Sequence, residues 1–280
     1  MSNRQSDLVL EPGVCLMDTH GHVNLEAYEG DRDQVIERIE NVGMKVIMPG
    51  TDFASSRLAV ELVAQHDSLL AAVGLHPGSV SEEEFAVRDY QELVNSGLVK
   101  AIGECGLDYF RLPSDDQERQ RIQDLQQEVF EAQIILALSN DLPLILHGRE
   151  AKNPGSTDSV YDRMLRLLAE RQADRAVFHC FGGTVEQAKE ITNHGYYLGI
   201  TGIITFDKSG VLEQIVREVP WESVVLETDA PFLAPEPYRG KRNEPIYVIE
   251  VAKKVAEIKG LTVEEVIKQA WQNARELFRL

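Results

Sequence analysis

The sequence predicts a single-domain (β/α)₈ barrel, or TIM barrel, from two observations on a chain of 280 residues. Short runs rich in Val, Ile and Leu recur eight times, and segments with helical periodicity separate them. Candidate functional residues end five of these eight runs, and no Gly-rich dinucleotide fingerprint follows the first. In a barrel these ends converge on the C-terminal face of the strands, where we expect a metal site. An open α/β sheet is the alternative.

The predicted elements alternate along the whole chain. The strand-like runs occupy residues 14–19, 45–50, 69–74, 99–103, 142–146, 175–178, 196–201 and 223–228. Helical spacing of apolar residues is found between them, for example at Phe130, Ile134 and Leu138. Residues 244–280 predict two helices that split near Gly260 and complete the outer layer of the barrel. We therefore expect a barrel domain over residues 14–280, preceded by a polar tail, residues 1–13, whose part before Pro12 is a candidate disordered segment.

The composition, 43% hydrophobic and 26% charged, is that of an ordinary soluble protein. No apolar run approaches the roughly 20 residues that span a membrane. The amino terminus lacks the pattern of a secretory signal, so a cytoplasmic location is expected, and a monomer is favoured. The three cysteines show no C-x-x-C spacing and are expected to be buried free thiols.

The formal net charge of −18 excludes a non-specific, charge-driven DNA coat, because phosphate contacts depend on Lys and Arg. An enzyme that concentrates its cations at one site is still compatible with this charge. Bound divalent metals are often the largest local charges and invert the local electrostatics.

Six residues at the ends of apolar runs are candidate metal ligands: His20, His22, Glu104, His147, His179 and Asp229. Successive strand side chains alternate faces, so Asp18, His20 and His22 are expected on one side of the first strand. A single histidine at a strand end is more often structural. Four of the seven histidines lie at such ends, however, and imidazole is the commonest metal ligand.

Other polar residues share these strands. Glu227 has the same parity as Asp229 and is expected to support a ligand from deeper in the barrel, as is Asp18 beneath the paired histidines. His76 ends the third strand; it could contact substrate, support a ligand or make a purely structural hydrogen bond. His66 and His194 are expected at the surface or at a helix end.

A basic loop, residues 237–245, follows the eighth strand and carries Arg239, Lys241 and Arg242. A charge run is usually a solvated loop. This one lies on the face where barrel enzymes bind phosphate, so we favour phosphate recognition, with Arg149 as a second donor. Aromatic residues in the same mouth loops mostly pack, but one or two could stack on bases of a single strand. They are Tyr109, Phe110, Phe181, Phe206, Phe232 and Tyr238.

Together these segments resemble the TatD-like deoxyribonuclease family, a group of metal-dependent amidohydrolase-type barrels, from about Leu16 to the carboxyl end. The resemblance rests on residues 18–22 (DTHGH), 103–109 (GECGLDY), 147, 179–183 (HCFGG), 227–231 (ETDAP) and 239–245 (RGKRNEP). The chain departs from the common pattern at Gly78, where a second histidine often follows the proline, and at Cys105, where an aliphatic residue is usual. The departure at Gly78 bears on substrate preference.

The resemblance implies two divalent ions, and the mixed nitrogen and oxygen ligands suit Zn, Mn or Mg. One would be held by His20, His22 and Asp229, the other by His147 and His179, with Glu104 shared. It also implies hydrolysis of DNA phosphodiesters, by 3′ to 5′ removal of nucleotides from single-stranded or frayed ends. The expected catalytic residues are Glu104 and Asp229, with Asp229 orienting or deprotonating the attacking water. The expected substrate contacts are His76, Tyr109, Arg149, Arg239, Lys241 and Arg242.

Two other functions remain open at this point. A metal-dependent amide, ester or lactone hydrolase would keep the metals and change the bond, since fold does not fix function. A nucleic-acid or protein binding module that has lost catalysis is not expected, because all six candidate metal ligands are present.

Overall fold

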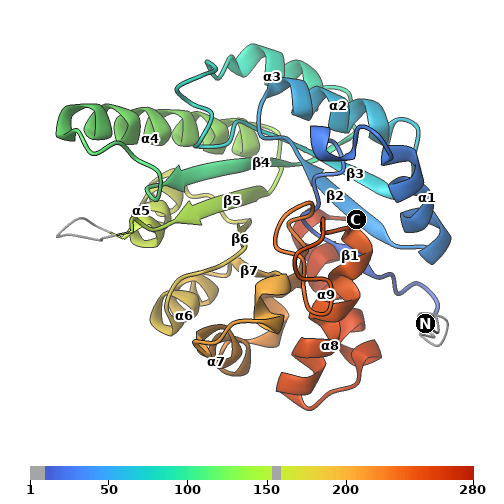
Figure 1. Ribbon diagram of the computed structural model, residues 1–280. Helices are drawn as coiled ribbons and strands as arrows, with labels where there is room; N and C mark the ends of the chain where they lie inside the picture. Colours follow the sequence, from blue (N-terminus) through green and yellow to red (C-terminus); the bar gives the residue numbers. More distant parts are fainter. Residues whose placement is uncertain (1–9, 153–158) are drawn as a thin grey trace.

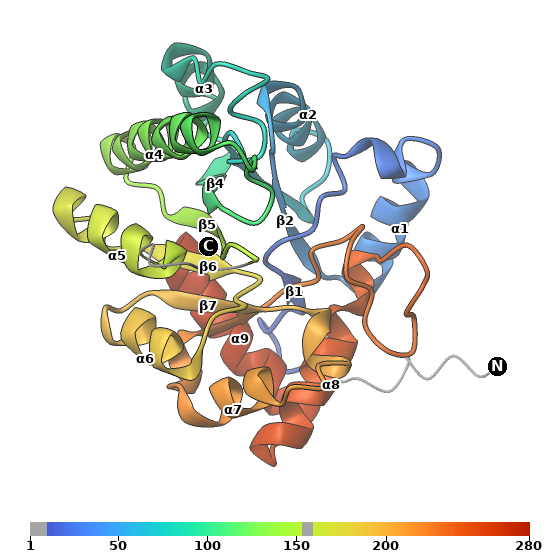
Figure 2. The same cartoon turned by 60° about the vertical axis from the view of Figure 1, so that its left-hand side comes forward.

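The computed structural model describes residues 10–152 and 159–280 and confirms the predicted (β/α)₈ barrel. Eight parallel strands form one sheet in sequential order, with helices outside it (Figures 1 and 2). The strands are β1 (Met17–Asp18), β2 (Lys45–Pro49), β3 (Leu69–Val73), β4 (Val99–Asp108), β5 (Leu144–Arg149), β6 (Ala176–His179), β7 (Tyr197–Ile200) and β8 (Val224–Leu226).

Helices alternate with the strands as predicted, and two more follow β8. The predicted periodicity holds for Phe130 and Ile134, which are buried, but not for Leu138, which is 40% exposed. The helices are α1 (Arg32–Val42), α2 (Phe53–Val63), α3 (Val87–Val94), α4 (Asp116–Ser139), α5 (Val160–Arg171), α6 (Val185–Asn193), α7 (Val211–Glu218), α8 (Val248–Lys259) and α9 (Val263–Phe278). Gly260, in the left-handed conformation, ends α8, and Thr262 and Glu265 form the predicted capping box of α9. No helix among the described residues is long and apolar enough to cross a membrane.

The inner surface of the strands packs against α9, which corrects one expectation. Trp271, Ala274, Leu277 and Phe278 of α9 form one buried cluster with inward-facing strand residues. Those strand residues are Met17, Ile47, Ala72, Ala101, Ile145, Val177 and Val225. Figure 2 shows α9 crossing behind the strands, whereas α8 lies in the outer ring. The last helix therefore fills the N-terminal end of the barrel, and only α8 completes the outer layer.

Residues 10–13 of the predicted tail contact this last helix. The Trp271 indole donates to the carbonyl of Gly13, and Lys268 pairs with Glu11 at 2.8 Å. The segment before Leu10, the greater part of the candidate disordered tail, lies outside the described residues.

The barrel closes between β1 and β8 through hydrogen bonds beyond the named strands. The backbone N–H of Thr19 donates to Leu226, that of Asp229 to His20 and that of His22 to Ala230, over 3.1, 2.8 and 2.7 Å. The side chain of Asp18 adds further hydrogen bonds between β1 and the segment after β8.

The Asp18 carboxylate is fully buried. It accepts from the backbone N–H of His20 (3.1 Å), from the N–H of Thr228 (2.9 Å) and from the Thr228 hydroxyl (2.5 Å). Its contacts are thus with the closing backbone, and the expectation that it supports an imidazole from beneath is replaced by a role in closing the barrel. Burial raises the pKa of Asp18 to about 7, against the lowering effect of these hydrogen bonds.

We predict that Asp18→Ala destabilises the fold, because it leaves two buried N–H donors unsatisfied at about 1–3 kcal/mol each. Asp18→Asn retains an acceptor oxygen for them and should cost clearly less. Urea unfolding of both variants in the presence of a chelator measures the difference without a metal contribution. Equal stability of Asp18→Ala and the parent protein would show that the carboxylate does not stabilise the contact between β1 and β8.

Candidate metal centre

His20 and His22 reach the mouth of the barrel after β1 has ended at Asp18, rather than along one continuous strand. The chain bends at Thr19, and the backbone contacts with β8 hold the segment in place. Both imidazoles are buried, and their Nε2 atoms lie 3.0 Å apart. The two rings therefore present nitrogen atoms to the same small volume.

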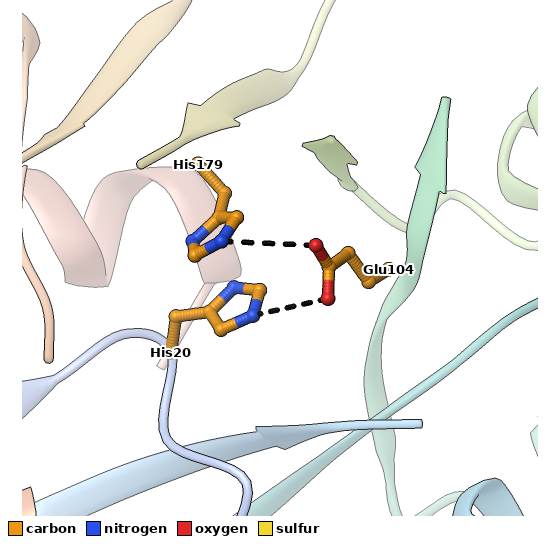
Figure 3. Close-up of side chains that lie close together, drawn as sticks. All are labelled: His20, Glu104 and His179. Carbon is orange, nitrogen blue, oxygen red and sulfur yellow. Dashed lines mark ion pairs between the residues drawn. The ribbon is translucent and has the colours of Figure 1, made fainter. Parts of the chain in front are cut away.

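Glu104 lies within the long strand β4 at a register shift between Ile102 and Cys105. An irregularity of this kind re-aims a side chain toward the interior. Gly103, with φ +150°, makes the close approach possible, because a Cβ there would lie 2.5 Å from the carbonyl oxygen of Ile145. The Glu104 N–H donates to Gly50 at the end of β2 over 3.0 Å. Figure 3 shows the resulting carboxylate pointing from β4 at His20 and His179.

The Glu104 carboxylate, 4% exposed, is the centre of the cluster. Five imidazole nitrogens surround it: His147 Nδ1 at 2.7 Å, His20 Nε2 at 3.4 Å, His22 Nε2 at 3.5 Å, and His76 Nε2 and His179 Nε2 at 3.7 Å. All six predicted ligands meet here once Asp229 is added.

Asp229 follows β8 in the left-handed conformation, with φ +56°, which Asp adopts more readily than most residues. Its Oδ1 lies 3.5 Å from His22 Nε2, 3.7 Å from His179 Nε2 and 3.9 Å from His20 Nε2. Asp229 thus faces Glu104 across the imidazoles.

Acceptors behind the ligand rings orient them. His22 Nδ1 lies 3.0 Å from the carbonyl oxygen of Pro49, and His179 Nδ1 lies 2.9 Å from Glu227 Oε1. Contacts of this kind fix which ring nitrogen carries the proton. Glu227 therefore lies deeper than Asp229 and against a candidate ligand, in the position expected from strand parity.

Asp108 is a functional candidate that the sequence analysis missed. Its Oδ2 lies 3.3 Å from His147 Nε2, so His147 lies between two carboxylates. Residues 104, 106 and 108 share one face of an extended strand, and this parity could have identified it. The predicted strand was too short to include it, because it ended at Gly103.

The pKa shifts reflect this crowding of charges. Burial and the neighbouring His179 lower the pKa of His20 to about 4, so its ring is neutral. Burial also disfavours the charged form of His147 and His179, but nearby carboxylates outweigh it and raise their pKa values to about 9 and about 10. Although burial alone would raise it, the surrounding histidines hold the pKa of Glu104 well below its usual range.

The donor atoms fit a divalent cation. With its proton on Nδ1 toward Pro49, a neutral His22 points its Nε2 lone pair at Glu104 Oε2 and Asp229 Oδ1, each 3.5 Å away. A lone pair and carboxylate oxygens repel unless a proton or a cation lies between them. Mixed imidazole and carboxylate ligation suits Zn²⁺ and Mn²⁺ and, less well, Mg²⁺.

Side chains whose donor atoms lie close together form several groups. One group matches the first predicted ligand set, whereas the residues of the second predicted set fall in different groups. His20, His22 and Asp229 form one group with all donor atoms within 4.8 Å of one another. The predicted partners His147 and His179 share no group: Glu104 forms one group with each of them, and His179 forms another with Cys180 and Asp229. His76 joins Glu104 and His147. The two groups that contain Glu104 thus include four imidazoles, and the sharing of Glu104 between two ions stays a prediction.

His76 lies at the rim of the cluster and is fixed from outside. The Gly78 N–H donates to His76 Nδ1 over 2.9 Å, which leaves the proton of the neutral ring on Nε2, toward Glu104. Burial and the nearby His147 lower the pKa of His76 to about 4. A Cβ at Gly78 would lie 2.9 Å from the same nitrogen, so the glycine lets the ring fold back onto the backbone.

The other predicted substrate contacts are dispersed around the mouth. Tyr109 is 8% exposed. Arg149 stacks over Phe110, and Arg239 over Phe206, each with 3.8 Å from Cζ to the ring centroid. Lys241 is exposed.

Arg242 differs from the other cations of the basic loop. It makes two hydrogen bonds to Asp31, at 2.7 and 2.6 Å, and lies over Tyr28. Its guanidinium thus joins the loop to the start of α1.

The two remaining histidines lie apart from the cluster, as expected. His66 pairs with Glu40 at 2.9 Å, and His194 is the C-cap of α6. Of the three thiols, Cys105 is buried, whereas Cys15 and Cys180 are only partly so, which corrects the expectation for these two.

Comparison with known proteins places this geometry among metal-dependent hydrolases. The family described as "TatD related DNase" matches residues 17–279. The uncharacterized metal-dependent hydrolase YabD of Bacillus subtilis is 38% identical over 271 residues, covering 95% of this chain and 99% of that protein. The 3′-5′ ssDNA/RNA exonuclease TatD of Erwinia tasmaniensis is 34% identical over 270 residues, covering 92% and 98%. The crystal structure of YjjV, a TatD homologue from Escherichia coli, matches with a TM-score of 0.82 at 28% identity, covering 95% of this chain and 98% of that one.

We predict that binding of Zn²⁺ or Mn²⁺ to the metal-free protein at pH 7 releases at least about two protons, because His147 and His179 are charged there and ligands must be neutral. His22 adds to the release, because Asp229 and Glu104 raise its pKa against the effect of burial. Isothermal titration calorimetry in buffers of different ionisation enthalpy measures the release.

The stability of the fold should fall with rising pH in the metal-free protein only, because bound metal keeps His147 and His179 neutral in the folded state. The raised pKa values of His147 and His179 stabilise the metal-free fold below their ordinary value of 6.5, and this stabilisation is lost as pH rises through about 9 to 10. Stabilisation by added metal should grow over the same range. Metal binding without proton release would exclude these two imidazoles as ligands.

Proposed function

The chain belongs to the TatD-related DNase family of metal-dependent hydrolases, and we propose that it cleaves DNA phosphodiester bonds, removing nucleotides in the 3′ to 5′ direction from single-stranded or frayed ends. The observation that carries the proposal is the buried Glu104 carboxylate surrounded by imidazoles, with Asp229 opposite and cationic side chains at the rim. The exonuclease activity named for the Erwinia tasmaniensis relative supports the choice of substrate.

Two divalent ions are part of the proposal. His20, His22 and Asp229 would hold one, and His147 and His179 the other, with Glu104 shared. Bound divalent ions supply Lewis-acid chemistry: they acidify water and neutralise charge on phosphoryl oxygens.

The side chains of the centre have different roles in the proposed reaction. Asp229 faces the imidazoles from the solvent side, and its side chain is 15% exposed, compared with 5% for the side chain of Glu104. Because water reaches Asp229 more easily, Asp229 is the carboxylate that would orient the attacking water and accept its proton. Glu104 holds the imidazoles together from below. His76 presents its Nε2 proton at the rim, where it can donate to a phosphate oxygen.

The rim provides the positive charge that the phosphate backbone requires. Arg149 and Arg239 stack on Phe110 and Phe206, which holds the guanidinium planes in place, and Lys241 is exposed in the loop after β8. Arg242 serves first to anchor the loop through Asp31. We infer that the phosphate contacts come from Arg149, Arg239 and Lys241, and that Arg242 sets their position.

We predict that Glu104→Gln lowers kcat/KM on single-stranded DNA by at least about 100-fold while the barrel stays folded, because the shared carboxylate charge is lost. The assay is release of nucleotides from the 3′ end of a 5′-labelled oligonucleotide with Zn²⁺, Mn²⁺ and Mg²⁺ in turn. His20→Ala should behave alike, whereas His66→Ala, on the outer surface, should match the parent protein.

Two outcomes would count against this assignment. Full activity of Glu104→Gln would exclude the shared carboxylate. No turnover of DNA with any metal, together with turnover of an amide, ester or lactone substrate, would favour the second class of hydrolase on the same barrel.

We predict that Lys241→Ala weakens binding of single-stranded DNA to a similar extent for every sequence. It should also reduce the slope of log K against log salt by about 0.7, the value for one phosphate contact on a single strand. Fluorescence anisotropy over a salt series measures the slope, with the Glu104→Gln variant used to prevent turnover. Lys253→Ala on α8, which removes a cation paired with Glu250, is the matched control. An unchanged slope for Lys241→Ala would show that Lys241 makes no contact with a DNA phosphate.

A further inference from the structure

The loop after β8 exposes an aromatic ring beside the metal centre. Phe232 is 52% exposed, the most exposed of the large hydrophobic side chains that the structure describes as exposed, and the others of that group are aliphatic. It follows Asp229 by three residues. Its ring centroid lies 6.4 Å from that of His22, with the two planes at 71°.

The backbone of Phe232 is fixed despite the exposure of its side chain. Its N–H donates to the carbonyl of Asp229 over 2.8 Å. The side chain of Asn243, which is fully buried, donates to the carbonyls of Phe232 (2.6 Å) and Thr228 (3.0 Å). The ring is therefore held at a set distance from the ligands and still presents its surface to solvent.

Two other aromatic rings of the mouth are covered by cations. Phe110 is covered by Arg149 and by Lys152, whose Nζ lies 4.6 Å from the ring centroid. Phe206 is covered by Arg239. Neither residue is among the exposed large hydrophobic residues, whereas Phe232 is.

The remaining aromatic candidates are packed against the protein. Tyr109 and Phe181 are buried, and Tyr238 stacks on Tyr247 with ring centroids 3.8 Å apart. Of the six aromatic residues expected in the mouth loops, Phe232 alone combines an exposed ring with a position against a candidate metal ligand.

We propose that Phe232 is a nucleobase-binding residue, on which the base of a nucleotide next to the scissile phosphate stacks. The ring lies close enough to His22 for a single nucleotide to place its phosphate at the centre and its base on the phenyl face. Stacking on an aromatic side chain favours a bound base by about 5- to 150-fold and tolerates any sequence. This inference rests on the proposed nuclease function and adds a subsite that selects nucleotides over other phosphodiesters.

The test compares two oligonucleotide substrates on the metal-loaded enzyme. One is a normal single strand; in the other, a tetrahydrofuran abasic residue replaces the nucleotide on one side or the other of the 3′-terminal phosphodiester. The parent protein should cleave the normal strand with a kcat/KM about 5- to 150-fold higher for one of these positions. Phe232→Ala should bring this ratio close to one, while Phe232→Tyr and Phe232→Trp should retain it.

Leu261→Ala, which alters an exposed side chain between α8 and α9, is the control and should keep the parent ratio. Metal content and thermal unfolding of each variant show whether the centre and the fold are intact. A second measurement places Phe232→Trp in the Glu104→Gln background. Tryptophan emission should be quenched by the normal strand and not by the abasic one.

Each failure has a distinct signature. Turnover with a base-dependent ratio that Phe232→Ala leaves unchanged would overturn the stacking role and leave the nuclease function standing. A parent protein without base dependence would do the same. Absence of DNA turnover with every metal would overturn the proposed function and the subsite with it.

Discussion

The centre of this barrel depends on one constraint, which is that a buried carboxylate must be compensated by positive charge or by hydrogen bonds. Glu104 is 4% exposed, and removing an ionised carboxylate from water costs several kcal/mol unless it is paired. The segment after β1, the segment after β3, and strands β5 and β6 contribute the five imidazoles that meet this requirement: His20, His22, His76, His147 and His179. The register shift in β4 and the positive φ of Gly103 are the backbone conditions that bring Glu104 to that position.

The sequence predicts much of this arrangement because parity and strand ends are local properties. Apolar runs ending in His147, His179 and Asp229 can be recognised without knowledge of the fold, and the alternation of strands and helices brings those ends to one face. The convergence of these ends on one face agrees with the structure. Glu104 was expected at such an end too, but it lies within β4 at the register shift, and its sharing between two ions stays a prediction.

What could not be predicted depends on contacts between distant segments. The register shift in β4 is set by pairing with β5. The strand predicted from the sequence therefore ended at Gly103 and did not include Asp108. Asp18 has the parity of a residue facing the site, yet the chain bends at Thr19 and uses it to close the barrel against Thr228. The pairing of Arg242 with Asp31 joins residues 211 positions apart. The amphipathic pattern of α9 shows that it packs, but not that it packs beneath the strands.

The position of α9 also has a consequence for the order in which the molecule can form. During synthesis, all eight strands emerge from the ribosome before the helix that fills the barrel's lower end. Until Phe278 is available, Met17, Ile47 and Val225 lack the apolar surface that covers them in the finished protein. A nascent chain that already contains every candidate metal ligand therefore still lacks the helix that packs against the inner face of its strands. Completion of the barrel core thus depends on a helix that contributes none of the candidate ligands.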